Sequence, residues 1–212
     1  MSISRDAVVD WIKSSAAAIA ANKDYLTQLD ADIGDGDHGA NMDRGFQAVL
    51  TKLSGVADKD IGTIFKTVGM TLVSTVGGAG GPLYGTFFMQ LGAATAGKME
   101  LTLADWAAAL QAGVDGVVMR GKANPGDKTM VDALTPALNT LKAAAADGRT
   151  LADALRQSVH AAGQGMTDTI PLVARKGRAS YLGERSAGHQ DPGATSSHLL
   201  LKTATDIWAN AG

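Results

Sequence analysis

Apolar residues recur at helical spacing along nearly the whole chain of 212 residues. Val8, Ile12 and Ile19 would share one helix face, and no segment has the alternation that indicates a strand. A helix is expected to begin at Pro82, because proline suits a first helical turn. With a last helix over 193–209, the pattern predicts eight helices, the others lying over 42–53, 61–72, 103–117, 130–141 and 151–170. Because most connections are short, we expect an all-α, antiparallel eight-helix bundle or barrel, one domain over 1–212.

Two features interrupt this helical pattern. Pro136 falls inside the helix expected over 129–145, where it should kink the helix or mark a boundary. The stretch 174–192 has no apolar periodicity and is rich in Gly, Arg and Ser. A loop of that length in a compact domain is usually functional or disordered.

Composition excludes several classes of protein. The chain has no cysteine, so disulfides, thiolate zinc sites and cysteine nucleophiles are excluded. A net charge of −2 gives no electrostatic reason to expect nucleic acid or an anionic membrane as a partner. The first residues lack the layout of a secretory signal, and no apolar run is long enough to span a membrane. We therefore expect a cytoplasmic protein that binds neither nucleic acid nor membrane.

Four aspartates crowd into the short segment 30–37, namely Asp30, Asp32, Asp35 and Asp37. Intervening glycines should prevent a regular helix, and the mutual repulsion of the carboxylates favours a bound cation. Oxygen ligands without cysteine indicate a hard ion, Mg²⁺ before Ca²⁺ or Mn²⁺. The segment also matches G-x-G-x-x-G, but no strand precedes it, and the offsets of an EF-hand fail. The alternative interpretation is a solvated acidic turn.

Three further clusters combine glycine with polar or charged residues. In 75–82, consecutive glycines precede a helix start, a combination that favours phosphate binding, although a flexible turn is the alternative. The segment 121–130 nearly matches a Walker A loop, but Asp127 stands where lysine is required. The segment 175–196 carries cations that could neutralise phosphate charge, or form a solvated basic loop. Taken alone, each cluster is weak.

Together, these segments resemble the nucleotide-binding L subunits of the dihydroxyacetone kinase family, and the likeness spans the chain in order. The matching motifs are Asp30-x4-Asp35-Gly-Asp37-His38-Gly39, Gly77-Gly78-Ala79-x-Gly81-Pro82, Gly126-Asp127-Lys128-Thr129-Met130, Arg175-Lys-Gly-Arg178, and Gly188-His-Gln-Asp191-Pro192-Gly193-Ala-Thr. The resemblance implies a barrel of eight antiparallel helices with the nucleotide at one end. One departure is Gly80, where some relatives carry a hydroxyl residue.

The resemblance also implies a set of functional residues. Asp30, Asp35 and Asp37 would hold two Mg²⁺ ions and, with Arg178, would be catalytic. The residues assigned to ADP or ATP are His38, Gly39, Ala40, Asn41, Ala79, Gly80, Gly121, Met130, Arg178, Asp191, Pro192 and Gly193. In that order, the first six would cradle phosphates, the next two would border the base, and the last four would complete the cap.

The resemblance finally implies partners. A separate K subunit would hold dihydroxyacetone, so this chain would be one subunit of a kinase acting on an alcohol. A multidomain phosphocarrier protein would recharge bound ADP to ATP in place, with phosphoenolpyruvate as the ultimate donor. Three alternatives stay open: a ketose or dihydroxyacetone kinase subunit using exchangeable ATP, a nucleotide-sensing partner of a transcription regulator, and a metal-dependent hydrolase.

Overall fold

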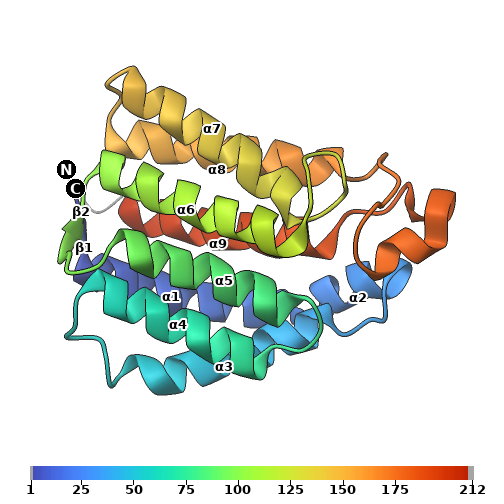
Figure 1. The fold of residues 1–212 in the computed structure, drawn as a ribbon, viewed down its shortest axis with the longest axis horizontal. Helices are drawn as coiled ribbons and strands as arrows, with labels where there is room; N and C mark the ends of the chain where they lie inside the picture. Colours follow the sequence, from blue (N-terminus) through green and yellow to red (C-terminus); the bar gives the residue numbers. More distant parts are fainter. Residues whose placement is uncertain (1, 210–212) are drawn as a thin grey trace.

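The computed structural model describes residues 2–209, and helices dominate that range. It contains nine α-helices, one 3-10 helix and one two-stranded sheet (Figure 1). In chain order these are β1 (Ile3–Ser4), α1 (Arg5–Ala21), α2 (Lys23–Ile33), α3 (His38–Leu53), α4 (Ile61–Thr75), α5 (Gly80–Ala94), β2 (Glu100–Leu101), α6 (Leu103–Gly121), α7 (Met130–Ala146), α8 (Leu151–Asp168), η1 (Arg178–Ser186) and α9 (Pro192–Trp208). The predicted all-α fold in a single domain is confirmed.

The long helices run up and down, so their connections gather at two ends (Figure 1). At the sheet end, on the left of the figure, β1 pairs antiparallel with β2 and the turns 54–60, 95–102 and 147–150 lie nearby. At the loop end, on the right, lie α2, η1 and the connections 34–37, 76–79, 122–129 and 169–191.

An aromatic cluster fills the core toward the sheet end. Trp11 lies in the second turn of α1, Trp106 in the first turn of α6 and Trp208 at the end of α9, and each is at most 1 % exposed. Their ring centroids lie 4.9 to 5.7 Å apart at steep angles, the edge-to-face geometry that aromatic pairs favour. The indole N–H of Trp11 donates to the Leu200 carbonyl, and that of Trp208 donates to the Ala7 carbonyl. The cluster therefore joins the first and last helices.

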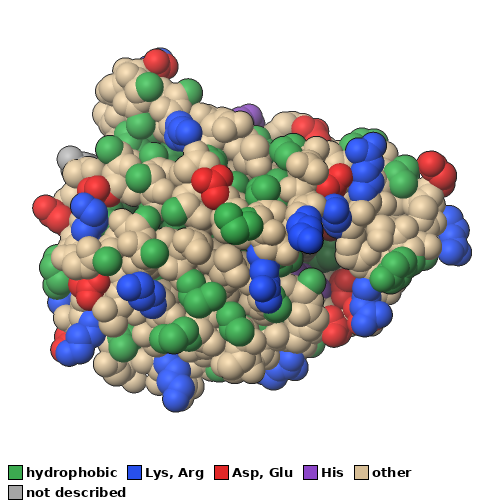
Figure 2. Space-filling model, viewed as in Figure 1, with side chains coloured by type: hydrophobic (Ala, Val, Ile, Leu, Met, Phe, Trp, Pro, Cys, Tyr) green, Lys and Arg blue, Asp and Glu red, His purple; other side chains and the backbone are tan. Residues whose placement is uncertain are grey.

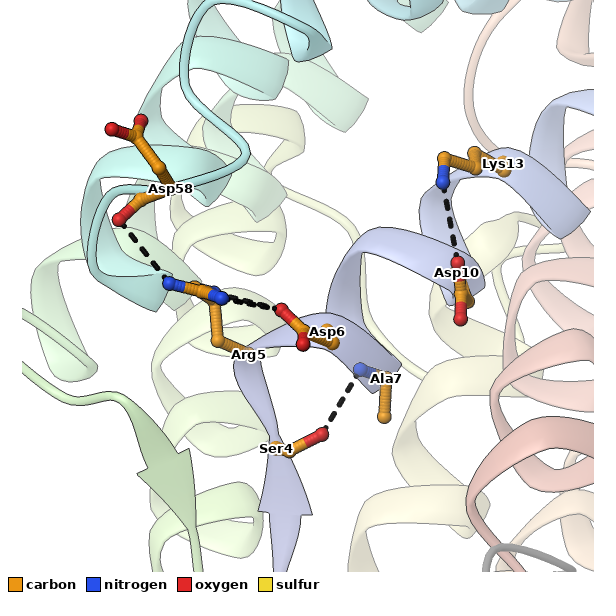
Figure 3. Close-up of polar contacts among 7 residues, drawn as sticks. All are labelled: Ser4, Arg5, Asp6, Ala7, Asp10, Lys13 and Asp58. Atoms are coloured by element: carbon orange, nitrogen blue, oxygen red, sulfur yellow. Dashed lines mark hydrogen bonds and ion pairs between the residues drawn. The ribbon is translucent and has the colours of Figure 1, made fainter.

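Each helix that begins at the sheet end is capped by the side chain of the residue that precedes it. Ser4, Asp60, Thr102 and Thr150 accept hydrogen bonds from first-turn amides of α1, α4, α6 and α8. Figure 3 shows the first case, in which the Ala7 amide donates to Ser4 Oγ at 3.1 Å. Such caps satisfy amides that have no partner within the helix.

Helices α4 and α5 approach each other closely through glycine. A β-carbon on Gly69 would lie 2.7 Å from the Gly85 carbonyl oxygen, and one on Gly85 would lie 2.9 Å from that of Gly69. Any side chain at either position would push the helices apart. The apolar periodicity of 61–72 did not reveal this requirement.

Several sequence expectations about local structure were wrong. Helix α2 was not expected, and Asp30 and Asp32 lie on it; only the segment after Ile33 is irregular, because α2 ends at Gly34. A short sheet exists although no strand was expected, because two residues leave no alternation to detect. Of the two expectations for Pro136, a helix boundary is wrong, because α7 continues through it, and a kink stays a prediction. In the described part of the chain, no helix has the length and apolarity needed to cross a membrane.

Candidate metal and phosphate site

A cavity of about 480 Å³ opens at the loop end, where the four connections meet. Figure 2 shows a hollow there, between the main body and the projecting part, bordered by both cationic and acidic side chains. All of the predicted site residues line it except Gly39 and Ala40. Gly39 instead faces α2, where a β-carbon would lie 2.0 Å from the Lys23 carbonyl oxygen.

Three of the four aspartates converge at the cavity wall. One carboxylate oxygen from each of Asp30, Asp35 and Asp37 lies within 4.8 Å of the other two. Asp30 lies in the last turn of α2 and accepts hydrogen bonds from the amides of Asp37 and His38, at 2.8 and 3.1 Å. These bonds fold the loop back over the helix end. A cluster of carboxylate oxygens is the donor set that Mg²⁺ prefers, so the residues fit such an ion.

The tight approach of the loop to Asp30 depends on Gly34. A β-carbon at this position would lie 2.1 Å from the Asp30 side-chain oxygen Oδ1 and 2.9 Å from its carbonyl oxygen. Glycine is therefore required here by space. Asp32 points elsewhere, and its carboxylate lies 3.7 Å from Nδ1 of His189.

Two α-helices begin at this cavity without a side-chain cap from the residue that precedes them. In residues 2–209, Asp37 before α3 and Ala79 before α5 make no such cap, although the amide of His38, the first residue of α3, is bonded to the Asp30 carboxylate. First-turn amides of these two uncapped helices have no helical acceptor, and the helix dipole makes both starts partly positive. Such starts bind anions. Two more helices, α7 and α9, begin at the cavity with their own caps, Thr129 and Asp191.

A buried hydrogen-bond network fixes His38 at the start of α3. Its Nε2 lies 2.9 Å from the Ser196 hydroxyl, which lies 2.6 Å from the hydroxyl of Tyr84. Burial lowers the pKa of His38, against the opposing effect of Asp30 and Asp37. Burial likewise raises the pKa of Tyr84 to about 12, so its hydroxyl stays protonated and also donates to the Gly193 carbonyl.

The arginine loop, residues 169–190, covers one side of the cavity. The Gly188 amide donates to the Ile170 carbonyl at 2.7 Å and closes the loop at its base. At the far side, Nε of Arg178 lies 3.0 Å from the Asp35 carboxylate. A cation thus stands beside the carboxylate cluster, on the exposed short helix η1.

Asp191 follows this loop and caps α9, its carboxylate accepting from the Ala194 amide at 2.7 Å. Burial raises the pKa of this carboxyl to about 7, against the lowering effect of the Ala194 amide. The negative form of Asp191 is therefore disfavoured where it stands.

Sequence reasoning missed the residues that complete the cavity. Tyr84, Leu83, Val117, Arg120 and Ala123 also line it. Leu83 and Val117 follow the same helical period as core residues, so no sequence signal distinguished them. Ser196 stands at the end of the segment 175–196, where no sequence pattern indicated its contact with Tyr84. The apolar side chains of Leu83, Val117 and Ala123 give the inner wall a surface suited to a flat ring.

The fold and site define a class: an all-α protein whose cavity sets a carboxylate cluster against anion-binding helix starts. The family model for the DAK2 domain matches residues 32–206. The chain is 48 % identical over 202 residues to the PEP-dependent dihydroxyacetone kinase, ADP-binding subunit DhaL, of Escherichia coli (strain K12), covering 95 % of this chain and 96 % of that one. It is 42 % identical over 204 residues to the PTS-dependent subunit of that kind from Lactococcus lactis subsp. lactis (strain IL1403), covering 96 % and 98 %.

The chain therefore belongs to the family of dihydroxyacetone kinase ADP-binding subunits, and the predicted resemblance is confirmed. Among solved structures it is similar to the dihydroxyacetone kinase of C. freundii in its native form, with a TM-score of 0.72 and 26 % identity. The same kinase in complex with AMP-PNP and Mg²⁺ gives a TM-score of 0.68 at 26 % identity. The two matches include 94 and 95 % of this chain, but only 34 and 33 % of the solved chains.

Proposed function

We propose that this chain is the nucleotide-binding subunit of a dihydroxyacetone kinase. It holds Mg-ADP or Mg-ATP in the cavity at the loop end and passes the phosphoryl group to dihydroxyacetone bound on a separate K subunit. The whole of residues 1–212 forms this one nucleotide-binding domain; α1, which precedes the matched range, packs on α9 through Trp11 and Leu200. A cytoplasmic location stays a prediction.

One observation carries the proposal: the three clustered carboxylates and the two uncapped helices line the same cavity. Carboxylates alone would repel phosphate, and helix starts alone would attract any anion. Together they suit a phosphate chain whose negative charge would be offset by Mg²⁺ held on the aspartates. The solved relative in complex with AMP-PNP and Mg²⁺ supports this interpretation.

Asp30, Asp35 and Asp37 would hold two Mg²⁺ ions. Bound there, the metal supplies positive charge that offsets the phosphates and the charge developing during transfer. The first-turn amides of α3 and α5 would orient phosphate oxygens, and Leu83, Val117 and Met130 would pack on the base. Arg178 would neutralise charge on the group in transfer, because phosphoryl transfer depends on positioning and electrostatics.

We further propose that bound ADP is recharged in place by a multidomain phosphocarrier protein. The relatives named PEP-dependent or PTS-dependent are 42 to 48 % identical and match nearly full length, which supports this branch. The alternative is a subunit that uses exchangeable ATP on dihydroxyacetone or a related ketose. It is supported by an L-erythrulose 1-kinase of Mycolicibacterium smegmatis at 33 % identity, but this chain spans 34 % of that protein.

The deciding experiment combines the purified chain, Mg²⁺ and dihydroxyacetone with or without the K subunit and phosphocarrier. We expect no product from the chain alone and full turnover from phosphoenolpyruvate only when all partners are present. Turnover that requires only free ATP and the K subunit would favour the alternative branch. Product from the isolated chain would contradict the proposal, and release of free phosphate without partners would favour a hydrolase. Binding of a transcription regulator without any transfer would favour a sensor.

A further inference from the structure

Lys128 occupies a position that is unusual for lysine. Its side chain is 1 % exposed, although lysine is almost never fully buried. Its backbone has a φ of 63°, in the left-handed region that non-glycine residues seldom adopt. Burial lowers the pKa of the ammonium, and the charge of Asp191 only partly opposes that effect. Two unfavourable features at one residue indicate that the surrounding structure uses this lysine.

The Lys128 ammonium, with its three N–H donors, lies within hydrogen-bond distance of four backbone carbonyls from both ends of the arginine loop. On the incoming side it reaches Thr169, Ile170 and Leu172, at 2.8, 3.4 and 3.2 Å. On the outgoing side it reaches His189. The two sides are also joined at this base by the Gly188 amide, which donates to the Ile170 carbonyl, and by the Asp191 amide, which donates to the Thr169 hydroxyl at 3.0 Å.

The segment that carries Lys128 is itself fixed against α7. The Asp132 carboxylate accepts from the amides of Gly126 and Thr129, at 2.5 and 2.7 Å. The carbonyl of Asp127 accepts from the Arg175 amide at 3.0 Å. The ammonium therefore connects a rigid helix start to the base of the loop.

We propose that Lys128 is a positioning residue: its buried ammonium gathers both ends of the arginine loop and thereby sets where Arg178 stands beside Asp35. Lys128 also lines the cavity, but its ammonium is bonded to the loop carbonyls, so its effect on the reaction passes through the loop. The role assigned to Arg178 rests on the proposed function, whereas the effect on the loop itself does not.

A test that needs no activity is limited digestion with trypsin, because Arg175, Lys176, Arg178 and Arg185 lie in the loop. In Lys128→Met we expect cleavage within the loop to rise at least about tenfold while the helices stay resistant, since local opening exposes the chain. Lys142→Met is the matched control, because this lysine is exposed on α7, outside the loop, and its ammonium donates to the side chain of Gln111. Unchanged cleavage in Lys128→Met would overturn the inference.

A second test asks whether Lys128 acts through Arg178. In the complete system, Lys128→Met should lower kcat about tenfold with little change in KM, because small misplacement of a charge slows transfer. In an Arg178→Ala background the same change should lower kcat less than about twofold, since coupled residues are not additive. Equal losses in both backgrounds would overturn the inference.

The two tests separate this inference from the proposed function. Wild-type protein that shows no turnover with its partners would contradict the function, and the trypsin result would still decide the role of Lys128 in the loop. Loss of the helical fold in both Lys128→Met and Lys128→Gln, seen by circular dichroism, would overturn the inference. The lysine would then support the whole fold.

Discussion

The two ends of the bundle differ in how the first amides of their helices are capped. At the sheet end, Ser4, Asp60, Thr102 and Thr150 each cap the helix they precede. At the loop end, among the residues described, the residues before α2, α3 and α5 make no side-chain cap, and the last two of these helices begin at the cavity. Asp37, which precedes α3, is of a type that commonly caps helices, yet its carboxylate joins the cluster with Asp30 and Asp35 instead. First-turn amides at the cavity are therefore available to another acceptor.

The ends also differ in what they crowd together. The sheet end buries three tryptophans in edge-to-face contact, which contributes to stability. The loop end gathers three carboxylates that repel one another. Stability and ligand binding are thus separated along the bundle, and mutations at the two ends should have different signatures.

The largest effect on stability should come from Trp11→Ala. Removing this ring leaves a cavity among four aromatic neighbours, and we expect the free energy of unfolding to fall by about 3–5 kcal/mol. Urea titration measures this change. Trp11→Phe is the control, and its free energy of unfolding should fall by less. If Trp11→Ala weakened Mg-ADP binding to the folded protein as strongly as a carboxylate change does, the two ends would not be separate.

Asp37→Asn should have the opposite signature. It removes an anionic oxygen from the cluster, and we expect Mg-ADP affinity to fall at least about 100-fold. Unfolding without ligand should change by less than about 0.5 kcal/mol, since in residues 2–209 this side chain does not cap α3. Calorimetry at fixed Mg²⁺ and a urea titration check the two parts. Unchanged ADP affinity would contradict the metal assignment.

Arg178→Ala should slow transfer more than it weakens binding. If its charge acts mainly during transfer, kcat in the complete system should fall about 30-fold, a typical loss for a hydrogen bond to a charged group. The dissociation constant of Mg-ADP should rise less than about threefold in the same variant. Arg185→Ala, on the same exposed short helix, is the control. Equal losses in kcat and affinity would reduce Arg178 to a binding residue.

Asp191 should make stability depend on pH. Its pKa rises from an ordinary 3.8 to about 7 in the folded protein, so the folded state keeps a proton that the unfolded state releases. Its contribution is most favourable below about pH 4 and declines as the pH rises toward 7. Asp191→Asn keeps an acceptor for the Ala194 amide and removes this decline.

Relative to wild type, the free energy of unfolding of Asp191→Asn should therefore rise by about 1–3 kcal/mol as the pH goes from 5 to 8. Urea titrations of both proteins at the two pH values give the difference. If the difference between variant and wild type were the same at both, the carboxyl would titrate normally.

The smallest effect belongs to a surface pair shown in Figure 3. Lys13 and Asp10 lie 3.3 Å apart, with side chains 59 % and 61 % exposed. Lys13→Ala should change the free energy of unfolding by less than about 0.5 kcal/mol, because solvent screens exposed pairs. The sheet end would then owe its stability to burial and capping. A change above about 1 kcal/mol would give surface charge a larger part.

The sequence predicted the long helices well because each one buries a single apolar face, and that need leaves a regular period. Helix α2 escaped notice because it buries few residues, Leu26, Leu29 and Ile33 among them, and carries charge on its remaining surface. The aspartates at its end have no apolar period to mark them as helical. Crowding predicts a cation site for four aspartates, whereas only Asp30, Asp35 and Asp37 converge and Asp32 lies against His189.

The site was predictable only where a residue type is rare in an ordinary helix. Asp35 and the glycines near Gly80 stand out against apolar periodicity, whereas Tyr84 and Val117 match it and were missed. Lys128 was quoted within a motif, but nothing in one dimension indicated that its ammonium would reach carbonyls some forty to sixty positions further along the chain. Partners distant in sequence become visible only once the helices are packed.

The indole of Trp208, by donating to the Ala7 carbonyl at 3.1 Å, brings the last helix back to the beginning of the first. The described chain is therefore almost a closed ring of helices, and the order in which they are connected is not dictated by their packing. A short linker that joins α9 to β1, with new chain termini in the turn at Gly148, would preserve all contacts between helices. Such a circular permutant would begin and end elsewhere on the sheet end and leave the cavity untouched.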